Sequence, residues 1–335
     1  MPTRLAINGF GRIGRNVLRA LHETGRDDLE VVAINDLMPL ETNMALLEHD
    51  TVHGAFPGNV SQGEGSLDIG RGPIAVFAER DPATLPWGDL KVDIVLECTG
   101  VFRDVPGASK HLEAGAKRVL ISAPAKGVER TVVYGVNEND IAVSDRIVSN
   151  ASCTTNCLSP IAKVLDDAFG LRRGFVTTIH SYTASQRLLD TGHKDARRAR
   201  AAAENIIPTT TGAARAVGLV LPKLAGKLDG TAIRVPTPNV SAIDFTFESE
   251  TDLTPQTIED AVRAAANGAM GAVIGVSDKP LVSRDFNHNP LSCVFDTYET
   301  RVLDHTMGRV LCWYDNEWGF SNRMLDVAAV MGRLS

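Results

Sequence analysis

The chain of 335 residues lacks several features that would place it in a special class of protein. No apolar run approaches the roughly 20 residues needed to cross a bilayer, and the first residues lack the cationic and long apolar regions of a secretory signal. The five cysteines are an odd number, which disfavours a disulfide framework. An excess of positive charge is missing too, since the net charge is −7. We therefore expect a cytoplasmic protein with no membrane partner and with no nucleic acid as its main ligand.

The remaining composition is that of a globular protein, with 44% hydrophobic and 22% charged residues, and the length is enough for two domains with full cores. In the first 150 residues, short apolar runs alternate with helical patterns, as in a strand at 4–7, a helix at 11–24 and a strand at 30–34. Such alternation predicts a largely parallel sheet covered by helices. Further expected elements are strands at 92–98, 117–121 and 131–136, a helix at 108–115, and loops at 71–73 and 124–127.

The pattern changes after residue 157, where longer and partly alternating strands appear. The expected strands are at 175–180, 231–235, 241–248, 271–276 and 293–296, and the expected helices at 158–169, 212–221, 255–266 and 320–331. This mixture predicts an α+β second domain with a mainly antiparallel or mixed sheet. The expected fold class is therefore an α/β domain followed by an α+β domain.

Three glycines with the spacing G-x-G-x-x-G follow the first predicted strand: Gly9, Gly11 and Gly14. In dinucleotide-binding folds these glycines permit a tight turn, a close approach of the backbone to a pyrophosphate, and close packing of the helix on the strand. Asp36 ends the second predicted strand, where an acid can accept a hydrogen bond from a ribose hydroxyl. The glycines could also serve packing alone, and Asp36 could be a turn or capping residue. Their order along the chain favours a nucleotide site.

Cys153 lies between a strand-like run at 145–150 and an apolar helical pattern that begins at Leu158. A thiol at a helix N-terminus meets unpaired N–H groups and the positive end of the helix dipole, which lower its pKa and favour a reactive thiolate. A buried, unreactive cysteine is the simpler alternative. A zinc site shared with Cys157 is disfavoured, because the other three cysteines are scattered singly. The surroundings of Cys153 favour a nucleophile, and we expect no metal site.

A nucleophilic cysteine needs a base, and His180 is the leading candidate. It closes the predicted strand at 175–180, where a strand end could point the imidazole at the thiol. On the residues alone, other histidines could serve as well: His53, His111, His193, His288 and His305.

Groups that can bind anions gather in the second half of the chain. The run 209–212 (Thr-Thr-Thr-Gly) precedes a helical pattern and offers hydroxyl and N–H groups to a phosphate. Arg234 lies inside a predicted strand, an unusual place for a charge unless it meets an anion or a partner. The basic segment before it consists of Lys194, Arg197, Arg198 and Arg200. Most of that segment could equally be a solvated or subunit-facing surface. A thiol nucleophile, a dinucleotide fold and phosphate-binding groups together indicate a phosphorylated aldehyde that is oxidised through a thioester.

Five motifs in order make the chain resemble the phosphorylating (type I) glyceraldehyde-3-phosphate dehydrogenases. They are residues 8–15 (NGFGRIGR), 151–157 (ASCTTNC), 206–214 (IIPTTTGAA), 234–240 (RVPTPNV) and 313–319 (WYDNEWG). The resemblance covers nearly the whole chain. It implies a homotetramer with a Rossmann NAD-binding domain at 1–151, a catalytic and substrate-binding domain at 152–316, and a C-terminal helix at 317–335 that packs back on the first domain.

By the same resemblance, Cys153 is the nucleophile, and His180 is its base and later its acid. The implied cofactor contacts are Gly9, Gly11, Arg12, Ile13, Gly14, Asp36, Arg80, Ser122 and Asn316. The implied contacts of the substrate and of inorganic phosphate are Ser152, Thr154, Thr183, Arg198, Thr211, Gly212 and Arg234. The implied reaction oxidises the triose phosphate glyceraldehyde 3-phosphate reversibly to 1,3-bisphosphoglycerate, with NAD and inorganic phosphate. The backbone N–H of Cys153 would stabilise the oxyanion.

The chain departs from this family pattern in places that bear on the phosphate and cofactor sites. Ser185 stands where the family usually has an acid, beside one expected anion site. Thr191 and Gly192 stand where NAD-preferring members usually carry Leu-Pro. Smaller and more polar residues there could admit a 2′-phosphate, although Asp36 would repel it, so NADP use is a hypothesis beside NAD. Phe320 replaces a tyrosine that is common after Trp-Gly.

Two other functions stay open on the sequence. Erythrose-4-phosphate dehydrogenases share the cysteine and the histidine but hydrolyse the thioester to a free acid, and the stretch 282–288 and Phe320 occur in both groups. The run 209–214 follows the triose-phosphate pattern instead. A catalytically idle relative that only binds a nucleotide or a partner would form no thioester, but both expected catalytic residues are present here.

Overall fold

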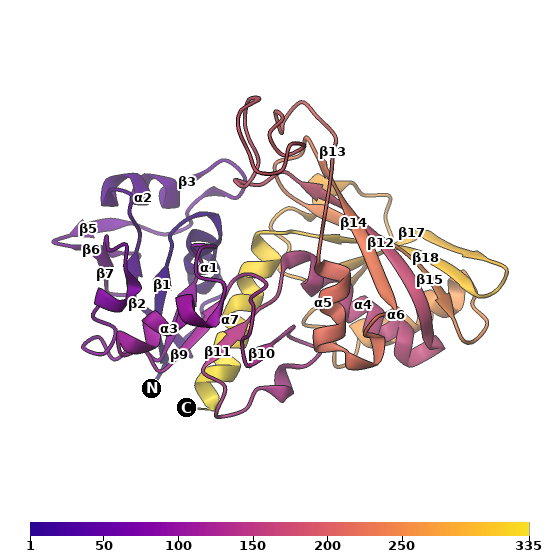
Figure 1. The fold of residues 1–335 in the computed structure, drawn as a ribbon, viewed down its shortest axis with the longest axis horizontal. Coiled ribbons are helices and arrows are strands. Elements are labelled where there is room, and N and C mark those ends of the chain that lie inside the picture. Colours follow the sequence, from indigo (N-terminus) through magenta and orange to yellow (C-terminus); the bar gives the residue numbers. More distant parts are fainter. Residues whose placement is uncertain (335) are drawn as a thin grey trace. The chain divides into compact units, whose positions relative to one another are not determined.

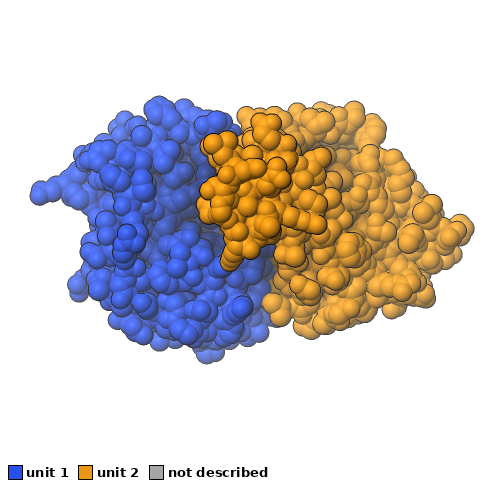
Figure 2. All heavy atoms as spheres, turned by 45° about the horizontal axis from the view of Figure 1, so that its top comes forward, with its two compact units in different colours: residues 1–134, 138–152, 321–335 blue, residues 135–137, 153–320 orange. Residues whose placement is uncertain are grey.

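The computed structural model describes residues 1–334 and divides into two compact units, which Figure 2 colours separately. The first unit comprises residues 1–134, 138–152 and 321–334 (blue), and the second comprises 135–137 and 153–320 (orange). Each unit is built on a large sheet of its own. Within residues 1–334, every helix is too short or too polar to span a bilayer.

The first unit has an α/β arrangement on a nine-stranded sheet. Its elements are β1 (Thr3–Asn8), α1 (Arg12–Glu23), β2 (Leu29–Asn35), α2 (Leu40–Glu48), β3 (His49–Asp50), β4 (Gly54–Ala55), β5 (Ser61–Gly63), β6 (Ser66–Asp68), β7 (Pro73–Phe77), β8 (Ile94–Glu97), α3 (Val105–Glu113), β9 (Arg118–Ile121), β10 (Arg130–Thr131) and β11 (Ile147–Ser149), with short 3-10 turns at Pro82–Thr84 and Glu138–Asp140. The strand order is β10-β11-β9-β8-β1-β2-β7-β6-β5. Neighbours from β10 to β7 run parallel, and the two pairs β7–β6 and β6–β5 are antiparallel. The predicted largely parallel sheet is confirmed.

The carboxyl ends of three central strands meet at one edge of this sheet. Asn8, the last residue of β1, pairs in register with Asn35 of β2 on one side and with Glu97 of β8 on the other. All three residues are buried. Because the strand order reverses at β1, this edge is the topological switch point, where open α/β sheets bind their ligands.

Helix α1 starts at this edge after a sharp turn (Figure 1). The turn passes through Gly9, whose φ of 91° lies in the left-handed region that favours glycine. Further along α1, the apolar side chains of Val17, Leu18 and Leu21 are buried. The packing of this apolar stripe holds the helix N-terminus at the carboxyl end of β1.

Helix α7 (Trp318–Arg333) begins in the second unit and ends in the first. Its apolar side chains, such as Leu325, are buried. Near its C-terminal end, the buried Arg118 of β9 donates to the carbonyl oxygen of Met331 and, at 3.0 Å, to that of Leu334. These bonds satisfy carbonyl groups that the end of a helix leaves without partners.

The second unit is a seven-stranded mixed sheet with helices on one side of it (Figure 1). Its elements are α4 (Cys153–Phe169), β12 (Leu171–Ser181), β13 (Ile207–Thr209), α5 (Ala213–Val220), β14 (Leu228–Val235), β15 (Ser241–Ser249), α6 (Pro255–Ala266), β16 (Ile274–Ser277), β17 (Cys293–Leu303) and β18 (Met307–Tyr314), with 3-10 turns at Pro222–Leu224 and Ser283–Phe286. The strand order is β13-β14-β12-β15-β18-β17-β16, and only the pairs β12–β14 and β16–β17 are parallel. The predicted α+β fold with a mainly antiparallel, mixed sheet is confirmed.

Strand β12 shows that the two faces of this sheet differ. Val176 and Thr178 are each 1% exposed, whereas Phe175 and Ile179 are 52% and 37% exposed. The alternation arises because successive side chains of a strand point to opposite faces. The sheet therefore presents apolar side chains on a face that the helices of the second unit leave uncovered.

Several elements differ from those predicted. The expected strand at 131–136 shrinks to β10, which ends at Thr131, although Val132 and Val133 after it are fully buried. The apolar run there reflects burial of an irregular segment rather than strand geometry. The loop expected at 71–73 ends at Pro73, the first residue of β7, a position that tolerates proline. The elements missing from the sequence prediction are α2, the five strands β3 to β7, β13 and β18.

Candidate functional site

The expected nucleophile and base meet in the second unit. Cys153 is the first residue of α4, so the helix begins earlier than the apolar pattern predicted, and the side chain is partly buried. Its Sγ lies 3.5 Å from Nε2 of His180, the residue before the end of β12. This distance between sulfur and nitrogen suits proton transfer from a thiol to an imidazole.

Two neighbouring strands hold the imidazole in place. His180 of β12 and Arg234 of β14 are register partners in a parallel pair, which places their side chains on the same face of the sheet. Nη1 of Arg234 lies 2.8 Å from Nδ1 of His180 and donates to the carbonyl oxygen of Ser181 at 2.8 Å. The same oxygen lies 2.7 Å from Nδ1 of His180. When Nδ1–H donates to this carbonyl, Nε2 presents its lone pair to the thiol.

The surroundings keep His180 unprotonated. Burial disfavours the imidazolium cation, and the positive charge of Arg234 adds to this effect, so the pKa of His180 is lowered to about 3. The charge of Arg198 acts in the same direction. The imidazole is therefore neutral near pH 7, which is the state that a general base requires.

The thiol of Cys153 is less acidic than its place at a helix start predicts. Burial raises its pKa, and the charge of Arg234 together with hydrogen bonds from Thr154 opposes this rise without reversing it. The prediction considered the helix dipole and left out desolvation, which disfavours a thiolate. The expectation of a lowered pKa is therefore wrong for this structure. The resting group is a thiol, and activating it requires a base that removes the proton.

Tyr314 of β18 supports this arrangement and is missing from the predicted site. Its hydroxyl lies 2.9 Å from the hydroxyl of Thr154 and 2.9 Å from that of Thr178. Its ring meets that of His180 edge-on, with centroids 6.0 Å apart. The phenol is buried, and burial raises its pKa. Tyr314 thus ties α4, β12 and β18 together at the site as a neutral hydroxyl group.

Asn316, an expected cofactor contact, is held by two buried hydroxyls. Its Oδ1 accepts hydrogen bonds from Oγ of Ser181 and from Oγ of Ser241, both at 2.8 Å. Ser181 therefore contacts His180 through its carbonyl oxygen and Asn316 through its hydroxyl. Both serines are missing from the predicted site, because a serine at a strand end carries no specific signal in the sequence.

Two of the expected anion-binding residues lie close to the catalytic pair. Arg198 and Arg234 both lower the pKa of His180 through their positive charges. Arg198 Nε donates to Oγ1 of Thr209 at 2.9 Å, and this hydroxyl donates to Asp195 at 3.2 Å. The two guanidinium groups create a positive region around His180, which suits phosphate groups.

The other expected phosphate contacts lie around two loops. Oγ1 of Thr183 is 3.0 Å from Oγ of Ser185, the residue that replaces an expected acid. Oγ1 of Thr211 accepts the backbone N–H of Ala213 at 3.1 Å, at the start of α5, and Gly212 precedes this helix directly. Ser152 belongs to the first unit.

The remaining cysteines of the second unit are core residues. Cys157 follows Cys153 by one turn of α4, and it is fully buried, as are Cys293 and Cys312. Within residues 1–334, no group of three or more His, Cys, Asp or Glu side chains is arranged to hold a metal ion.

The glycine fingerprint lines a cavity in the first unit. The cavity measures about 430 Å³, a size within the range of small-molecule sites. Four of the expected cofactor contacts line it: Gly9, Gly11, Asp36 and Arg80. Asn8 and Asn35 belong to its wall as well, so the cavity lies at the carboxyl edge of β1 and β2.

The three fingerprint glycines have different reasons to be glycine. A Cβ at Gly9 would lie 2.6 Å from the backbone nitrogen of Thr99, and a Cβ at Gly14 would lie 2.1 Å from the carbonyl oxygen of Gly9. Close packing therefore requires both. A Cβ at Gly11 would meet nothing within 4 Å. Packing gives no reason for a glycine there, whereas a close approach of a dinucleotide to the backbone does. The residues present fit the expected cofactor.

Replacing Gly14 with alanine will lower the free energy of unfolding by about 1–3 kcal/mol, because the new methyl group clashes with a backbone carbonyl. Gly11→Ala is the matched variant. It will change the free energy of unfolding by less than about 0.5 kcal/mol and will weaken binding of NAD, since its methyl group enters the cavity. Urea unfolding and calorimetric titration measure the two effects. Equal losses of stability in both variants would contradict the separate roles.

Asp36 and Arg12 are both engaged within the protein. Asp36 accepts the backbone N–H groups of Phe10 at 2.7 Å and Met38 at 2.9 Å, which fixes the carboxylate at the cavity wall with lone pairs left for a ribose hydroxyl. The guanidinium of Arg12 pairs with the buried Asp50. Burial opposes the ionisation of Asp50, yet Arg12 and neighbouring N–H groups hold its pKa at about 2. The cofactor contact at Arg12 stays a prediction; the start of a helix such as α1 is where backbone N–H groups bind phosphates.

The other expected cofactor residues do not line the cavity. Ile13 and Gly14 lie in the first turn of α1. Ser122 donates its backbone N–H to the carbonyl oxygen of Glu97 at 3.0 Å, and Asn316 belongs to the second unit. Each unit therefore carries part of the expected set.

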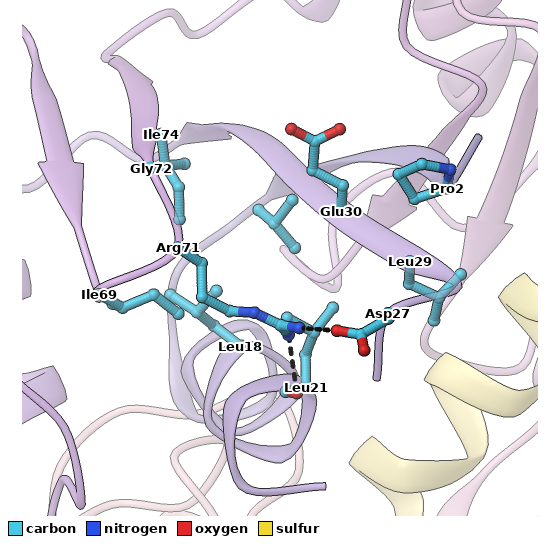
Figure 3. A pocket seen from close by; sticks show the side chains of 11 residues that line it. Pro2, Leu18, Leu21, Asp27, Leu29, Glu30, Ile69, Arg71, Gly72 and Ile74 are labelled. Carbon is cyan, nitrogen blue, oxygen red and sulfur yellow. Dashed lines mark hydrogen bonds and ion pairs between the residues drawn. The ribbon is translucent and has the colours of Figure 1, made fainter. Parts of the chain in front are cut away.

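A second cavity of the first unit lies beside the start of β2 (Figure 3). It measures about 200 Å³. Arg71 points across it and donates to Oδ1 of Asp27 at 2.6 Å and to the carbonyl oxygen of Leu21 at 3.3 Å. None of the expected functional residues lines this cavity, so we assign it no part in the site.

Comparison with known proteins agrees with the geometry of both units. Residues 3–105 match the family described as "Glyceraldehyde 3-phosphate dehydrogenase, NAD binding domain", and residues 152–316 match "Glyceraldehyde 3-phosphate dehydrogenase, C-terminal domain". Proteins named glyceraldehyde-3-phosphate dehydrogenase from Cereibacter sphaeroides and Xanthobacter flavus are each 60% identical to this chain over 334 residues, covering 100% of both chains. One from Zymomonas mobilis is 56% identical over 335 residues, covering 99% of both. The chain belongs to the glyceraldehyde-3-phosphate dehydrogenase family.

Proposed function

We propose that this chain is a phosphorylating glyceraldehyde-3-phosphate dehydrogenase, which uses NAD and inorganic phosphate and forms a thioester at Cys153. The observation that carries the proposal is the pair of Cys153 and His180, with Sγ 3.5 Å from Nε2, beside the guanidinium of Arg234. Identity of 60% over the full length of relatives with this name supports the triose phosphate as substrate. The match to an NAD-binding domain supports the cofactor.

The first half of the reaction makes the thioester. Nε2 of His180 takes the proton of Sγ, and the sulfur electron pair forms a bond to the aldehyde carbon. The backbone N–H of Cys153, at the start of α4, is placed to stabilise the charge that develops on the aldehyde oxygen, which then takes up the proton. Bound NAD supplies a hydride acceptor. His180 removes the hydroxyl proton as the hydride leaves the same carbon, and the product is a thioester on Cys153.

The second half transfers the acyl group to phosphate. An oxygen of inorganic phosphate attacks the thioester carbon, the C–S bond breaks, and 1,3-bisphosphoglycerate leaves. The departing sulfur regains its proton from the imidazolium form of His180. Arg198 and Arg234 hold the phosphate groups of substrate and co-substrate as charge-assisted donors. Every step is reversible, so the same residues serve the reduction of the acyl phosphate.

We also propose that the enzyme is a homotetramer in the cytoplasm. The uncovered face of the second sheet supports a subunit contact, because Phe175 and Ile179 expose large apolar surfaces there. Leu188 and Leu189 are 79% and 74% exposed and support a second contact. Sedimentation equilibrium of the purified protein tests the number of subunits, and a monomer at micromolar concentration would contradict it.

Initial rates with two sugar phosphates test the proposed activity. We expect the highest kcat/KM with glyceraldehyde 3-phosphate in the presence of inorganic phosphate, and a large loss of steady-state turnover when phosphate is left out. Efficient oxidation of erythrose 4-phosphate to a free acid without phosphate would favour the hydrolytic relatives instead. Failure to form any thioester in a single turnover would indicate a protein that only binds.

NAD will be preferred over NADP by about 10-fold or more in kcat/KM, because the fixed carboxylate of Asp36 repels a 2′-phosphate. NADP turnover will remain measurable, because by the family resemblance the smaller, more polar Thr191 and Gly192 replace the Leu-Pro of NAD-preferring members, and both are exposed. Initial rates with both cofactors measure the ratio, and Asp36→Asn will narrow it. Undetectable NADP turnover would end the hypothesis of dual use, and equal efficiencies would contradict the repulsion by Asp36.

A further inference from the structure

A buried carboxylate beside the cofactor cavity takes no part in the reaction described above. Glu97 ends β8 and is 1% exposed. Its Oε1 accepts the backbone N–H of Thr99 at 2.8 Å and also the Thr99 hydroxyl. Its Oε2 accepts Nδ2 of Asn8 at 2.6 Å and lies 3.0 Å from Nε2 of His111. These donors provide the hydrogen bonds without which burial of a carboxylate would be very unfavourable.

His111 has to act as a donor in this group. The indole N–H of Trp87 lies 3.1 Å from Nδ1 of His111, and an indole nitrogen can only donate. Nδ1 is therefore the acceptor, and the ring proton is on Nε2, where it faces Glu97. Both rings are completely buried, so water cannot replace either partner.

A chain of amide hydrogen bonds leads away from Glu97 along the carboxyl edge of the sheet. Oδ1 of Asn8 accepts Nδ2 of Asn35 at 2.8 Å, and Oδ1 of Asn35 accepts the backbone N–H of Glu79 at 2.8 Å. The chain crosses β8, β1 and β2, which are neighbours in the sheet, and reaches the segment after β7. Glu97 accepts from the Asn8 amide nitrogen, and this leaves Oδ1 of Asn8 to accept from Asn35, so the carboxylate determines which way the Asn8 amide faces. The amide of Asn35 is also held by the backbone of Glu79, because its Nδ2 donates to the Glu79 carbonyl oxygen at 2.9 Å.

The same contacts shape the wall of the cavity. The Thr99 hydroxyl that donates to Glu97 also accepts the backbone N–H of Val101 at 3.0 Å, which organises the loop 97–101. The backbone of this loop packs so closely on the fingerprint turn that a Cβ at Gly9 would lie 2.6 Å from Thr99. Asn8, Gly9, Thr99 and Val101 all line the cavity. A displaced Glu97 would therefore disturb both the fingerprint turn and the wall beside it.

We propose that Glu97 is a positioning residue of the cofactor site: its buried carboxylate orients Asn8 and the loop 97–101, and through them it sets the affinity for NAD. The inference rests on the cofactor site of the proposed function. A glutamine at this position has one acceptor oxygen and two amide donors, so the amide nitrogen faces other donors. His111 cannot relieve this conflict by moving its proton to Nδ1, because Trp87 donates there.

Calorimetric titration of the full-length apo protein with NAD tests the proposal. In Glu97→Gln we expect the Kd for NAD to rise by about 10-fold or more and the KM for NAD to rise with it, while kcat at saturating NAD stays within about threefold. The matched control is Asp166→Asn in the second unit, since Asp166 is also a buried carboxylate with a backbone donor, the N–H of Leu171 at 2.9 Å. That variant will lose stability and keep the wild-type Kd within twofold.

A second pair of variants decides the question if Glu97→Gln does not fold. Thr99→Val removes the hydroxyl that donates to Glu97 and accepts the N–H of Val101, the two bonds by which Glu97 organises the loop, and will weaken NAD binding by about threefold or more. Thr99→Ser keeps the hydroxyl and will bind like the wild type. Unchanged Kd values in both Thr99→Val and a folded Glu97→Gln would overturn the inference. Failure of the wild-type protein to bind NAD would instead overturn the proposed function.

Discussion

Cys153→Ala will lower the rate of phosphate-dependent oxidation of glyceraldehyde 3-phosphate by about 10⁴-fold or more, because the variant lacks the atom that bonds to the aldehyde carbon. Initial rates of NADH formation measure the loss. Mass spectrometry after a single turnover measures its cause: the wild-type protein will gain the mass of an acyl group, and the variant will not.

The control for this variant is Cys157→Ala, one turn further along the same helix. Cys157 is fully buried, so its replacement will lower the free energy of unfolding by about 1 kcal/mol. It does not touch the reacting atoms in the proposed mechanism, and its rate will stay within about threefold of the wild type. A Cys153→Ala protein with near wild-type activity would refute the thioester mechanism.

His180→Asn will lower kcat/KM by about 10²–10⁴-fold, the range that a general base contributes. The reason lies in the thiol, whose pKa is raised by burial, so that few thiolates form without a base. The activity of the variant will therefore increase with pH well beyond the point where the wild-type rate levels off. His305→Asn is the matched control, because His305 is exposed and its φ of 59° is one that asparagine adopts readily. A flat pH profile in His180→Asn would contradict the role of base.

The pH dependence of the free energy of unfolding provides a second test of the environment of His180. Its pKa is about 3 in the folded chain and near 6.5 when the chain is unfolded, so the unfolded state binds more protons between these values. The wild-type protein therefore loses stability as the pH falls below about 6.5, and this residue contributes about 2 kcal/mol of the loss at pH 5. His180→Asn will lack this contribution. Urea unfolding at pH 5 and at pH 8 compares the two proteins.

Local sequence patterns predicted those parts of the site that are formed by residues adjacent in the sequence. The three glycines after β1 and the cysteine after β11 lie at strand-to-helix turns, and a turn of this kind is visible in a short window of sequence. The partner of Cys153 is different. His180 reaches the thiol only because the long strand β12 ends beside the start of α4. On the sequence alone, five other histidines were equally good candidates for the base.

Long-range packing explains what the sequence prediction missed. Tyr314 and Ser241 are register partners on β18 and β15, and this pairing brings both hydroxyls to the site from distant parts of the chain. The raised pKa of Cys153 has the same origin, because desolvation depends on everything that packs around the sulfur. Val132 and Val133 are buried but lie outside β10. Their apolar run predicted burial correctly, whereas strand formation depends on hydrogen-bonding partners that the run does not reveal.

The hydrogen bonds from Arg118 to Met331 and Leu334 join residues that are 213 and 216 positions apart. They constrain the order in which the two units can complete their folds during synthesis. On the ribosome, the residues up to 152 emerge long before residues 321–334 have been synthesised. Until the whole second unit has been translated, the guanidinium of Arg118 has the carbonyl oxygen of Val143 as a partner, at 3.1 Å, but lacks those of Met331 and Leu334. Contacts of such long range slow folding. We therefore expect the second unit, which is nearly continuous in sequence, to be able to complete its fold first.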